Sequence, residues 1–299
     1  MTGDRRVSVV ILTHGRCEEC LRTVARFVAG GEAARVIVVD NASPDGTAAR
    51  VRARFPAVEV VALRRNLGAA ARNLGVRRAE TPYVALADDD TWWARGALGR
   101  AADLLDAHPR LAVVSARVLV GPEEREDPTC VRLAESPLPP ARDLPGVPIL
   151  GFLAGASMVR RAAFLAAGGF EARLFLGGEE ELLALDLGAA GWAMAYVPAV
   201  VVHHHPSPRR DPGARRRLLV RNALWCAWLR RPVPSALRQT LCILRAAHPA
   251  AAALAFGEAL RGLPWVLRAR RVVPAHVQSS LRRLDARLRL GARASQAPD

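Results

Sequence analysis

The chain has 299 residues, 51% of them hydrophobic, and it carries a formal net charge of +15. This length suits one large α/β domain with or without an appendage, and the apolar share is sufficient for a sizeable core. The longest apolar-rich segment, residues 246–260, is too short to span a bilayer, and the N-terminus lacks the layout of a secretory signal. We therefore expect a cytoplasmic protein.

The positive charge is unevenly spread along the chain. Residues 1–199 carry 24 arginines and 24 acidic residues, whereas residues 200–299 carry 19 arginines and 4 acidic residues, and the chain has no lysine. The last third therefore accounts for the whole excess. This asymmetry predicts a neutral body, residues 1–208, and a basic C-terminal region, residues 209–299, with different roles.

The five cysteines do not indicate a redox or zinc site. Cys17 and Cys20 form a C-x-x-C pair, but the two residues between them are glutamates, which raise the pKa of a thiol. A zinc site would need two more ligands at suitable spacing, and the chain has no second C-x-x-C.

The first 90 residues alternate between apolar runs and helical patterns. This alternation over short distances predicts a parallel sheet flanked by helices. In open sheets of this kind, ligands bind at the carboxyl ends of the strands. We expect strands at 7–12, 35–39, 58–63 and from 83, and helices at 18–28, 47–55 and 69–79.

Polar residues follow each of these strands where it ends. Since parallel strands end at the same edge of a sheet, we expect these side chains to gather at one place. The residues are Thr13, His14 and Arg16 after the first strand, Asp40, Asn41 and Ser43 after the second, Asn66 and Gly68 after the third, and Asp88, Asp89 and Asp90 after the fourth.

Three consecutive carboxylates, Asp88 to Asp90, end the fourth strand. Like charges this close repel one another unless a cation lies among them, and Mg²⁺ is typically held by one or two carboxylates together with substrate phosphates. The alternative is an acidic turn that caps a helix starting near Thr91, because Asp is a good N-cap. The other polar clusters at the same edge favour the metal–phosphate site.

The strand ends suit a nucleoside diphosphate better than NAD. A dinucleotide site would need G-x-G-x-x-G after the first strand, but the chain has T-H-G-R there, and a Walker motif needs lysine. Asp40 can accept a hydrogen bond from a ribose hydroxyl or a base N–H. Arg72, on the helix after Gly68, can pair with phosphate.

The second half of the body has three predicted features. A helix at 94–107 and a strand at 111–120 are followed by residues 121–148, whose seven prolines predict an irregular surface loop, either over an acceptor cleft or merely variable. Glu179, Glu180 and Glu181 start a helix at 180–190, where they favour the positive end of the helix dipole or supply a general base. A strand at 196–202 ends in three histidines.

Several of these segments, in this order, resemble the inverting nucleotide-sugar glycosyltransferases of family 2. The resemblance covers residues 7–205 and implies the A-type glycosyltransferase fold, a Rossmann-like, mostly parallel sheet flanked by helices. The matching segments are VSVVILTHGR, VIVVDNASPDGT, NLGAAARNLGVRRAETPYVALADDD, GFLAGASMVRRAAFLAAGGFEARLFLGGEEELLALDLGAAGW and YVPAVVVHHH.

The resemblance implies roles for the donor-binding residues. In that family, the Asp that ends the second strand binds the nucleotide base, which matches Asp40. The family's Asp-x-Asp holds a metal ion, Mn²⁺ or Mg²⁺, and the diphosphate, which matches Asp88 and Asp90. The further residues expected to bind the nucleotide sugar are Thr13, Arg16, Asn41, Asn66, Gly68, Arg72 and Asp89.

The resemblance also implies a catalytic base. In the family, the base usually lies in a Glu-Asp pair, which matches Glu179 and Glu180; the second member is Glu here, which keeps the carboxylate on a longer side chain. We expect Glu180 to be the base and Glu179 its orienting partner. A family histidine that completes the metal site matches His203, for which ordinary packing at the strand end is the alternative. His204 and His205 receive no role.

The C-terminal region reads as a set of basic amphipathic helices. Residues 215–231, RRRLLVRNALWCAWLRR, combine an apolar stripe with flanking arginines, and further helices are expected at 237–247, 254–267 and 278–290. Such helices suit an anionic membrane surface, but they also suit nucleic acid or packing on the body and on a partner subunit. Nucleic acid is the least favoured of these partners.

The sequence therefore predicts a metal-dependent inverting glycosyltransferase. It would move a sugar from a nucleoside diphosphate sugar to a hydroxyl of a glycan or lipid-linked acceptor, in cell-surface polysaccharide or glycolipid synthesis, in the cytoplasm or at the inner face of the membrane. One alternative is a nucleotidyltransferase that forms a sugar nucleotide, for which the loop after the first strand offers only Arg16. The other is a non-catalytic membrane- or nucleic-acid-binding protein, which leaves the acidic clusters unexplained.

Overall fold

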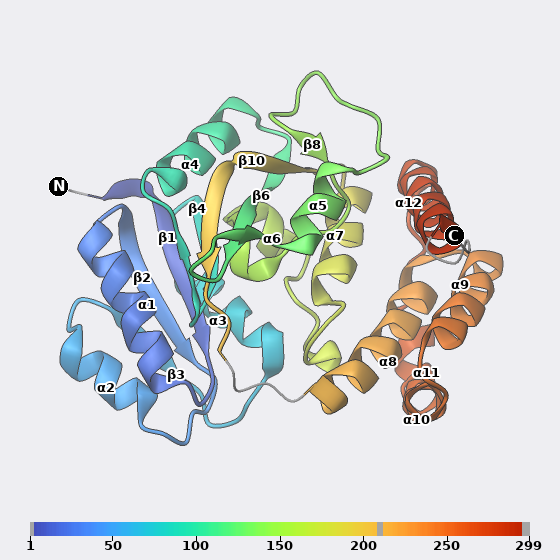
Figure 1. The fold of residues 1–299 in the computed structure, drawn as a ribbon, viewed down its shortest axis with the longest axis horizontal. Helices are drawn as coiled ribbons and strands as arrows, with labels where there is room; N and C mark the ends of the chain where they lie inside the picture. Colours follow the sequence, from blue (N-terminus) through green and yellow to red (C-terminus); the bar gives the residue numbers. More distant parts are fainter. Residues whose placement is uncertain (1–2, 208–211, 295–299) are drawn as a thin grey trace.

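The computed structural model describes residues 3–207 and 212–294, and its described strands form one mixed sheet (Figure 1). The sheet order is β3-β2-β1-β4-β9-β6-β10-β5, with β7 paired to β6 and β8 to β10. The predicted boundary between residues 208 and 209 falls outside the described residues. The strands are β1 (Asp4–Thr13), β2 (Ala33–Asp40), β3 (Glu59–Ala62), β4 (Tyr83–Asp88), β5 (Thr91–Trp93), β6 (Leu111–Val120), β7 (Arg125–Glu126), β8 (Val147–Pro148), β9 (Ser157–Arg160) and β10 (Ala193–His204).

The N-terminal half of the sheet is parallel, as the alternating pattern predicts. β1 pairs in parallel with β2 and β4, and β2 pairs in parallel with β3. The register sets Thr13 beside Asp40 and Leu12 beside Asp88, so these strands end together at one edge. β9 runs antiparallel between β4 and β6, and β10 is parallel to β6.

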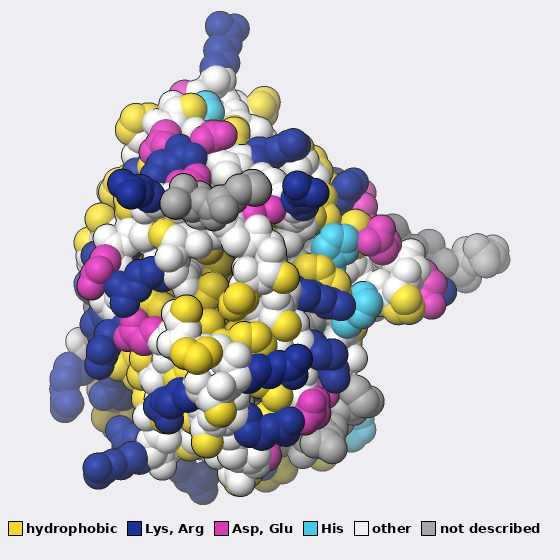
Figure 2. Space-filling model, turned by 90° about the vertical axis from the view of Figure 1, so that its left-hand side faces the viewer, with side chains coloured by type: hydrophobic (Ala, Val, Ile, Leu, Met, Phe, Trp, Pro, Cys, Tyr) yellow, Lys and Arg dark blue, Asp and Glu magenta, His cyan; other side chains and the backbone are white. Residues whose placement is uncertain are grey.

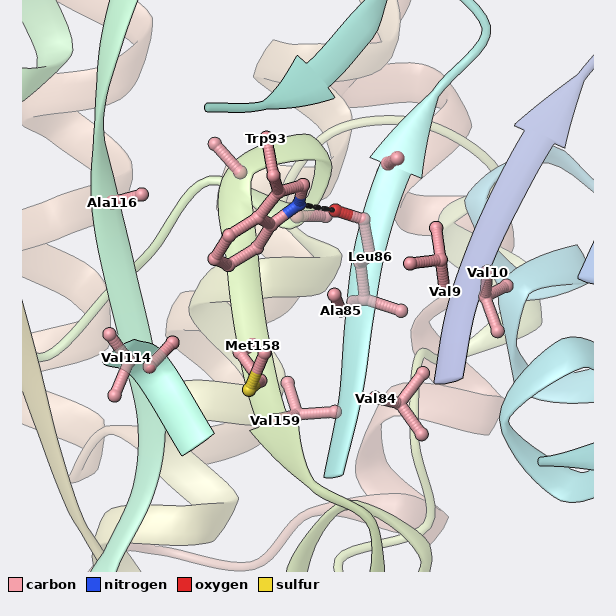
Figure 3. Close-up of a cluster of buried hydrophobic side chains, with 14 of the residues drawn as sticks. Val9, Val10, Val84, Ala85, Leu86, Trp93, Val114, Ala116, Met158 and Val159 are labelled. Carbon is pink, nitrogen blue, oxygen red and sulfur yellow. Dashed lines mark hydrogen bonds between the residues drawn. The ribbon is translucent and has the colours of Figure 1, made fainter. Parts of the chain in front are cut away.

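The core lies on both faces of this sheet. Val9, Val10 and Leu86 are completely buried, which explains why these strands read as continuous apolar runs rather than alternating ones. Trp93 fills the space between β4 and β6, where its indole Nε1 donates a 3.4 Å hydrogen bond to the Leu86 carbonyl (Figure 3). These buried side chains hold in place the strands whose carboxyl ends bear the polar residues.

Helices cover the sheet on both sides. Seen from the side of α1 and α2, arginine side chains are scattered over the surface among fewer acidic and apolar ones (Figure 2). The helices of the body are α1 (Cys17–Gly30), α2 (Thr47–Arg54), α3 (Arg72–Arg78), α4 (Ala97–Ala107), α5 (Pro128–Ala134), α6 (Arg161–Ala166) and α7 (Glu179–Ala189), with the 3₁₀ turns η1 (Gly68–Ala71), η2 (Ala154–Ala156) and η3 (Ala172–Leu174).

The structure contradicts a helix that starts near Thr91. Residues 91–93 form β5 instead, which pairs antiparallel with the end of β10, and α4 begins only at Ala97. One threonine and two tryptophans favour an extended backbone that packs on a sheet. The acid triplet therefore lies in a tight turn between two strands and does not cap a helix.

The proline-rich segment 121–148 is not wholly irregular. It contains β7, α5 and β8. Asp127 caps α5, since its side chain accepts a hydrogen bond from the Thr129 amide, and Pro128 occupies the first helical position. A cap residue followed by proline is a recognised signal for a helix start, so this helix was detectable from the sequence.

The described part of the basic C-terminal region consists of five helices joined by short connections, of which residues 270–274 are the longest. The predicted helix at 254–267 is two helices that meet at Gly262, where a Cβ would lie 2.4 Å from the Trp225 ring. No single described helix has the length and apolarity to cross a membrane, whereas α10 and α11 meet these criteria as a pair bent by 59°. The helices are α8 (Pro212–Arg230), α9 (Val233–Ala246), α10 (Pro249–Arg261), α11 (Leu263–Ala269) and α12 (Ala275–Ala294).

Helix α7 joins the body to the C-terminal helices and lies between them (Figure 1). Leu182 of α7 belongs to the same buried cluster as Leu224 and Trp225 of α8. Asp186 of α7 makes a two-pronged ion pair with Arg230, with N–O distances of 2.6 and 2.8 Å. The Arg230 side chain is only 5% exposed, so this pair neutralises a buried charge at the junction between α7 and α8.

We expect Asp186→Asn to destabilise the protein by about 3–5 kcal/mol, because it leaves the Arg230 guanidinium buried without a counter-ion. Equilibrium urea unfolding measures this change. Glu18→Gln is the control, since the Glu18–Arg50 pair is exposed on both sides and its loss should leave the urea midpoint unchanged. Equal midpoints for both variants would show that the Asp186–Arg230 pair does not stabilise the junction.

Candidate active site

The turn after β2 is organised by Asn41. Its amide nitrogen donates to Asn66 Oδ1 at 2.8 Å and to the Gly68 carbonyl at 3.1 Å, and its oxygen accepts from the Leu67 amide at 2.8 Å. Asn41 is 2% exposed. Asn41 and Asn66 therefore shape the loop after β3, and the buried carboxylate of Asp40 lies beside them at the end of β2.

Asp89 faces the interior of the protein. Its side chain is 0% exposed, Thr13 Oγ1 donates to its Oδ2 at 2.9 Å, and Arg16 Nη2 lies 3.2 Å from its Oδ1. Burial raises the pKa of Asp89 to about 7, against the opposing effect of Arg16. Thr13 and Arg16, both predicted to bind the donor, therefore already contact a member of the acid triplet, Asp88 to Asp90.

Asp90 is also paired within the protein. Arg16 Nη1 lies 2.9 Å from its Oδ2, His204 Nε2 lies 3.6 Å from its Oδ1, and the Ser207 amide donates to Oδ2 at 3.2 Å. Burial acts to raise the pKa of Asp90, but His204 and Arg16 outweigh it and lower this pKa to about 2. Asp90 is therefore ionised at neutral pH.

The structure does not bring His203 to the acid triplet. Its Nδ1 lies 3.1 Å from Glu124 Oε1, and its ring stacks on Trp92. His204, which received no role from the sequence, is the histidine that faces Asp90, because side chains alternate along β10. The pairing of His204 opposite Thr91 fixes this face, and that register was not readable from the sequence.

Asp88 is the open member of the triplet. Its side chain is 35% exposed, compared with 0% and 2% for Asp89 and Asp90. The guanidinium of Arg72, from the first turn of α3, pairs with Asp88 Oδ1. Gly155 lies directly against the carboxylate, since a Cβ at this position would be 2.6 Å from Asp88 Oδ2.

The glutamate pair begins α7. Glu179 is 3% exposed, and its Oε2 has no hydrogen-bond partner among the described residues, while Glu180 Oε1 accepts a 3.5 Å contact from the Ala154 amide. Burial raises the pKa of both carboxyls, and the charge of Glu180 adds to the effect on Glu179. Arg72 interacts electrostatically with Asp88, Glu179 and Glu180, and this links the pair to the triplet.

The oxygen donors of this edge fit a hard divalent cation through Asp88. Among residues 3–207 and 212–294, no three His, Cys, Asp or Glu side chains are grouped as a full ligand set. A cation held by one or two carboxylates and by substrate phosphates does not require such a group. Asp88 has the accessible oxygens for this role, whereas Arg16 already compensates the charge of Asp90.

Both the sequence and the fold are similar to those of known proteins. N-acetylglucosaminyl-diphospho-decaprenol L-rhamnosyltransferase of Mycobacterium tuberculosis is 29% identical over 213 residues, which are 60% of this chain and 69% of that protein. The fold resembles a mannosyltransferase from Pyrobaculum calidifontis, solved with GDP-Man and Mn²⁺, with a TM-score of 0.59, 21% identity and coverage of 94% of this chain and 86% of that one.

A second solved structure has the same fold. TarS of S. aureus, in complex with UDP-GlcNAc, has a TM-score of 0.55 and 16% identity, over 80% of this chain and 71% of that one. The model of the family described as "Glycosyl transferase family 2" matches residues 8–166, more than half of the chain. The protein therefore belongs to glycosyl transferase family 2 and is a glycosyltransferase.

Proposed function

We propose that the protein is a metal-dependent, inverting glycosyltransferase of cell-wall polysaccharide synthesis. It moves a sugar from a nucleoside diphosphate sugar to a hydroxyl of a glycan or lipid-linked acceptor. The observation that carries the proposal is that Arg72 pairs with the open carboxylate of Asp88 and interacts electrostatically with Glu179 and Glu180 of α7. The names of the relatives support it, since the Mycobacterium tuberculosis protein is a rhamnosyltransferase whose named substrate is a diphospho-decaprenol.

In this proposal the donor binds along the carboxyl ends of β1 to β4. Asp40 accepts from the base or ribose, and the loop held by Asn41 and Asn66 borders the nucleotide. Asp88 would hold Mn²⁺ or Mg²⁺, and the ion would supply positive charge to offset that of the leaving diphosphate. Arg72 fixes the Asp88 carboxylate through their ion pair. Asp89 and Asp90 stabilise the turn through their hydrogen bonds and ion pairs with Thr13, Arg16 and His204.

Glu180 is the proposed general base. As the acceptor hydroxyl attacks the anomeric carbon from the face opposite the diphosphate, Glu180 takes its proton, and this geometry inverts the anomeric centre. Burial raises the pKa of Glu180, which makes its carboxylate a stronger base than a free glutamate. A base whose pKa lies closer to the working pH transfers protons more effectively. Glu179, the preceding residue of α7, is the proposed orienting partner of Glu180.

The nucleotidyltransferase alternative is weaker. Such an enzyme needs a cation after the first strand to receive a triphosphate, and Arg16 is the residue of that loop that could supply one. In the structure, Arg16 is already paired with Asp89 and Asp90. The alternative of a protein without catalytic activity is excluded by the family.

Glu180→Gln tests the base. We expect transfer to fall by about 10²–10⁴-fold, the usual contribution of a general base, while the dissociation constant of the sugar nucleotide with Mn²⁺ stays unchanged. Rates come from nucleoside diphosphate release with a panel of sugar nucleotides and acceptors. Glu181→Gln is the matched control from the same helical turn and should keep the wild-type rate. Full activity of Glu180→Gln would assign the base to another residue.

Asp88→Asn tests the metal site. The wild-type protein should gain thermal stability from Mn²⁺ and a sugar nucleotide together, and Asp88→Asn should lose most of this gain because it removes the accessible anionic ligand. Asp103→Asn is the control, since Asp103 is an exposed partner of Arg6 away from the acid triplet. If no sugar nucleotide in the panel stabilises the wild-type protein or is cleaved by it, the proposed function is wrong.

The basic C-terminal region is proposed to rest on the anionic inner surface of the membrane. Arginines outnumber acids strongly there, and Val233, Leu237 and Leu241 recur every four residues on one face of α9. Most of the large apolar side chains that the described chain exposes lie in this region. They are Leu219, Val233, Leu237, Leu241, Leu254, Phe256, Leu260, Leu267, Val272 and Leu288.

Vesicle flotation tests the membrane surface. The protein should float with vesicles that contain anionic phospholipid and not with neutral ones, and salt should weaken the binding. Leu237→Gln with Leu241→Gln should reduce flotation, whereas Val28→Gln with Val131→Gln, two exposed apolar positions of the body, should not. Equal flotation of both double variants, or none of the wild type at low salt, would contradict the proposal.

A further inference from the structure

A side chain from the C-terminal region holds the segment that leads into the glutamate pair. Asn222 of α8 is 0% exposed. Its side-chain nitrogen donates to the carbonyls of Leu174 at 2.7 Å, Leu176 at 3.1 Å and Gly177 at 2.5 Å. One buried amide therefore binds three main-chain carbonyls within residues 174–177, the last of them two residues before Glu179.

This segment needs such support because its backbone is unusual. Phe175 has φ 63° and ψ −63°, and the Leu176 amide donates to the Leu174 carbonyl at 2.7 Å, which together make a rare and strained γ-turn. Gly177 and Gly178 follow with φ values of 84° and 88°. Glycine adopts these φ values without strain, whereas the conformation of Phe175 persists only where the surroundings determine it.

The opposite side of residues 174–178 contacts η1, which follows the loop after β3 at the edge where the donor is proposed to bind. The Ala69 amide of η1 donates to the Phe175 carbonyl at 2.6 Å. Gly68 approaches the same oxygen so closely that a Cβ would lie 1.9 Å from it. The segment is thus held between η1, which belongs to the donor edge, and α8, which belongs to the C-terminal region.

The neighbour of Asn222 fixes the orientation of its amide. Arg221 donates to Asn222 Oδ1 from Nε at 3.0 Å and from Nη2 at 2.8 Å. With its oxygen bound to a guanidinium, the amide must turn its N–H groups toward the three carbonyls. A carboxylate in this place would set its oxygens against carbonyl oxygens and would add a negative charge near the glutamate pair.

We propose that Asn222 is a positioning residue for sugar transfer. It fixes the start of α7, so that the Glu180 carboxylate meets the acceptor, and it acts only through the main chain of residues 174–178. The proposal rests on the proposed function, in which Glu180 is the base. It makes the C-terminal region a component of the catalytic centre in addition to any role at a membrane.

Asn222→Asp tests this role because it removes both N–H donors at nearly constant size. We expect kcat to fall on the order of 10²-fold, the effect of a small misplacement of a reacting group, while the donor KM and the stabilisation by Mn²⁺ and donor stay at wild-type values. The acidic limb of the kcat–pH profile should move to higher pH, because the new charge raises the pKa of the glutamate pair further. Faster hydrogen exchange of the amides of residues 174–180 should accompany it.

Two further variants complete the test. Gln278→Glu makes the same chemical change at an amide that binds the Val273 carbonyl, in the part of α12 that packs on the C-terminal end of α7 and not on the glutamates at its start, and it should keep the wild-type kcat. Asn222→Ser keeps one donor and adds no charge, so it replaces Asn222→Asp if that variant does not fold. A wild-type kcat in the folded Asn222 variant would overturn the positioning role while leaving the transferase intact, whereas an inactive wild-type protein would overturn the proposed function itself.

Discussion

Two arginines hold three adjacent carboxylates at the end of β4, and the layout of the site depends on this charge compensation. Buried carboxylates are costly unless they are paired and hydrogen-bonded. Arg16 comes from the turn after β1 and reaches Asp89 and Asp90, whereas Arg72 comes from the start of α3 and reaches Asp88. Each arginine thereby ties the loop of a different strand to the same turn, so the strand ends form one surface.

The same compensation divides the three acids by role. Asp89 and Asp90 are buried, and their partners come from β1, the turn after it and the end of β10, so they serve the architecture of the edge. Asp88 and the glutamates of α7 share the electrostatic influence of Arg72, and they are the carboxylates to which the proposed function assigns the chemistry. A triplet that looks uniform in the sequence therefore contains two buried, paired carboxylates and one accessible carboxylate, the proposed metal ligand.

The sequence was sufficient for the parallel half of the sheet, because its signals are local runs and strand-end residues. It could not choose between His203 and His204, since that choice depends on the register of β10 against β5. Neither could it reveal Asn222, whose partners lie more than forty positions away in the chain. The break of the predicted 254–267 helix, by contrast, was readable from the sequence, because Pro264 has no N–H for the helical hydrogen bond and instead occupies the first turn of α11 after Gly262.

The contact of Gly68 and Ala69 with Phe175 limits which segments of this chain could be exchanged for those of another protein. The loop of residues 174–178 meets the donor edge through one backbone hydrogen bond and meets α8 through Asn222. A chimera that joined this body to the C-terminal helices of a relative would break one side of that junction unless both sides were transplanted together. In this chain η1, this loop and α8 therefore have to be exchanged as one unit, although η1 ends at Ala71 and α8 begins only at Pro212.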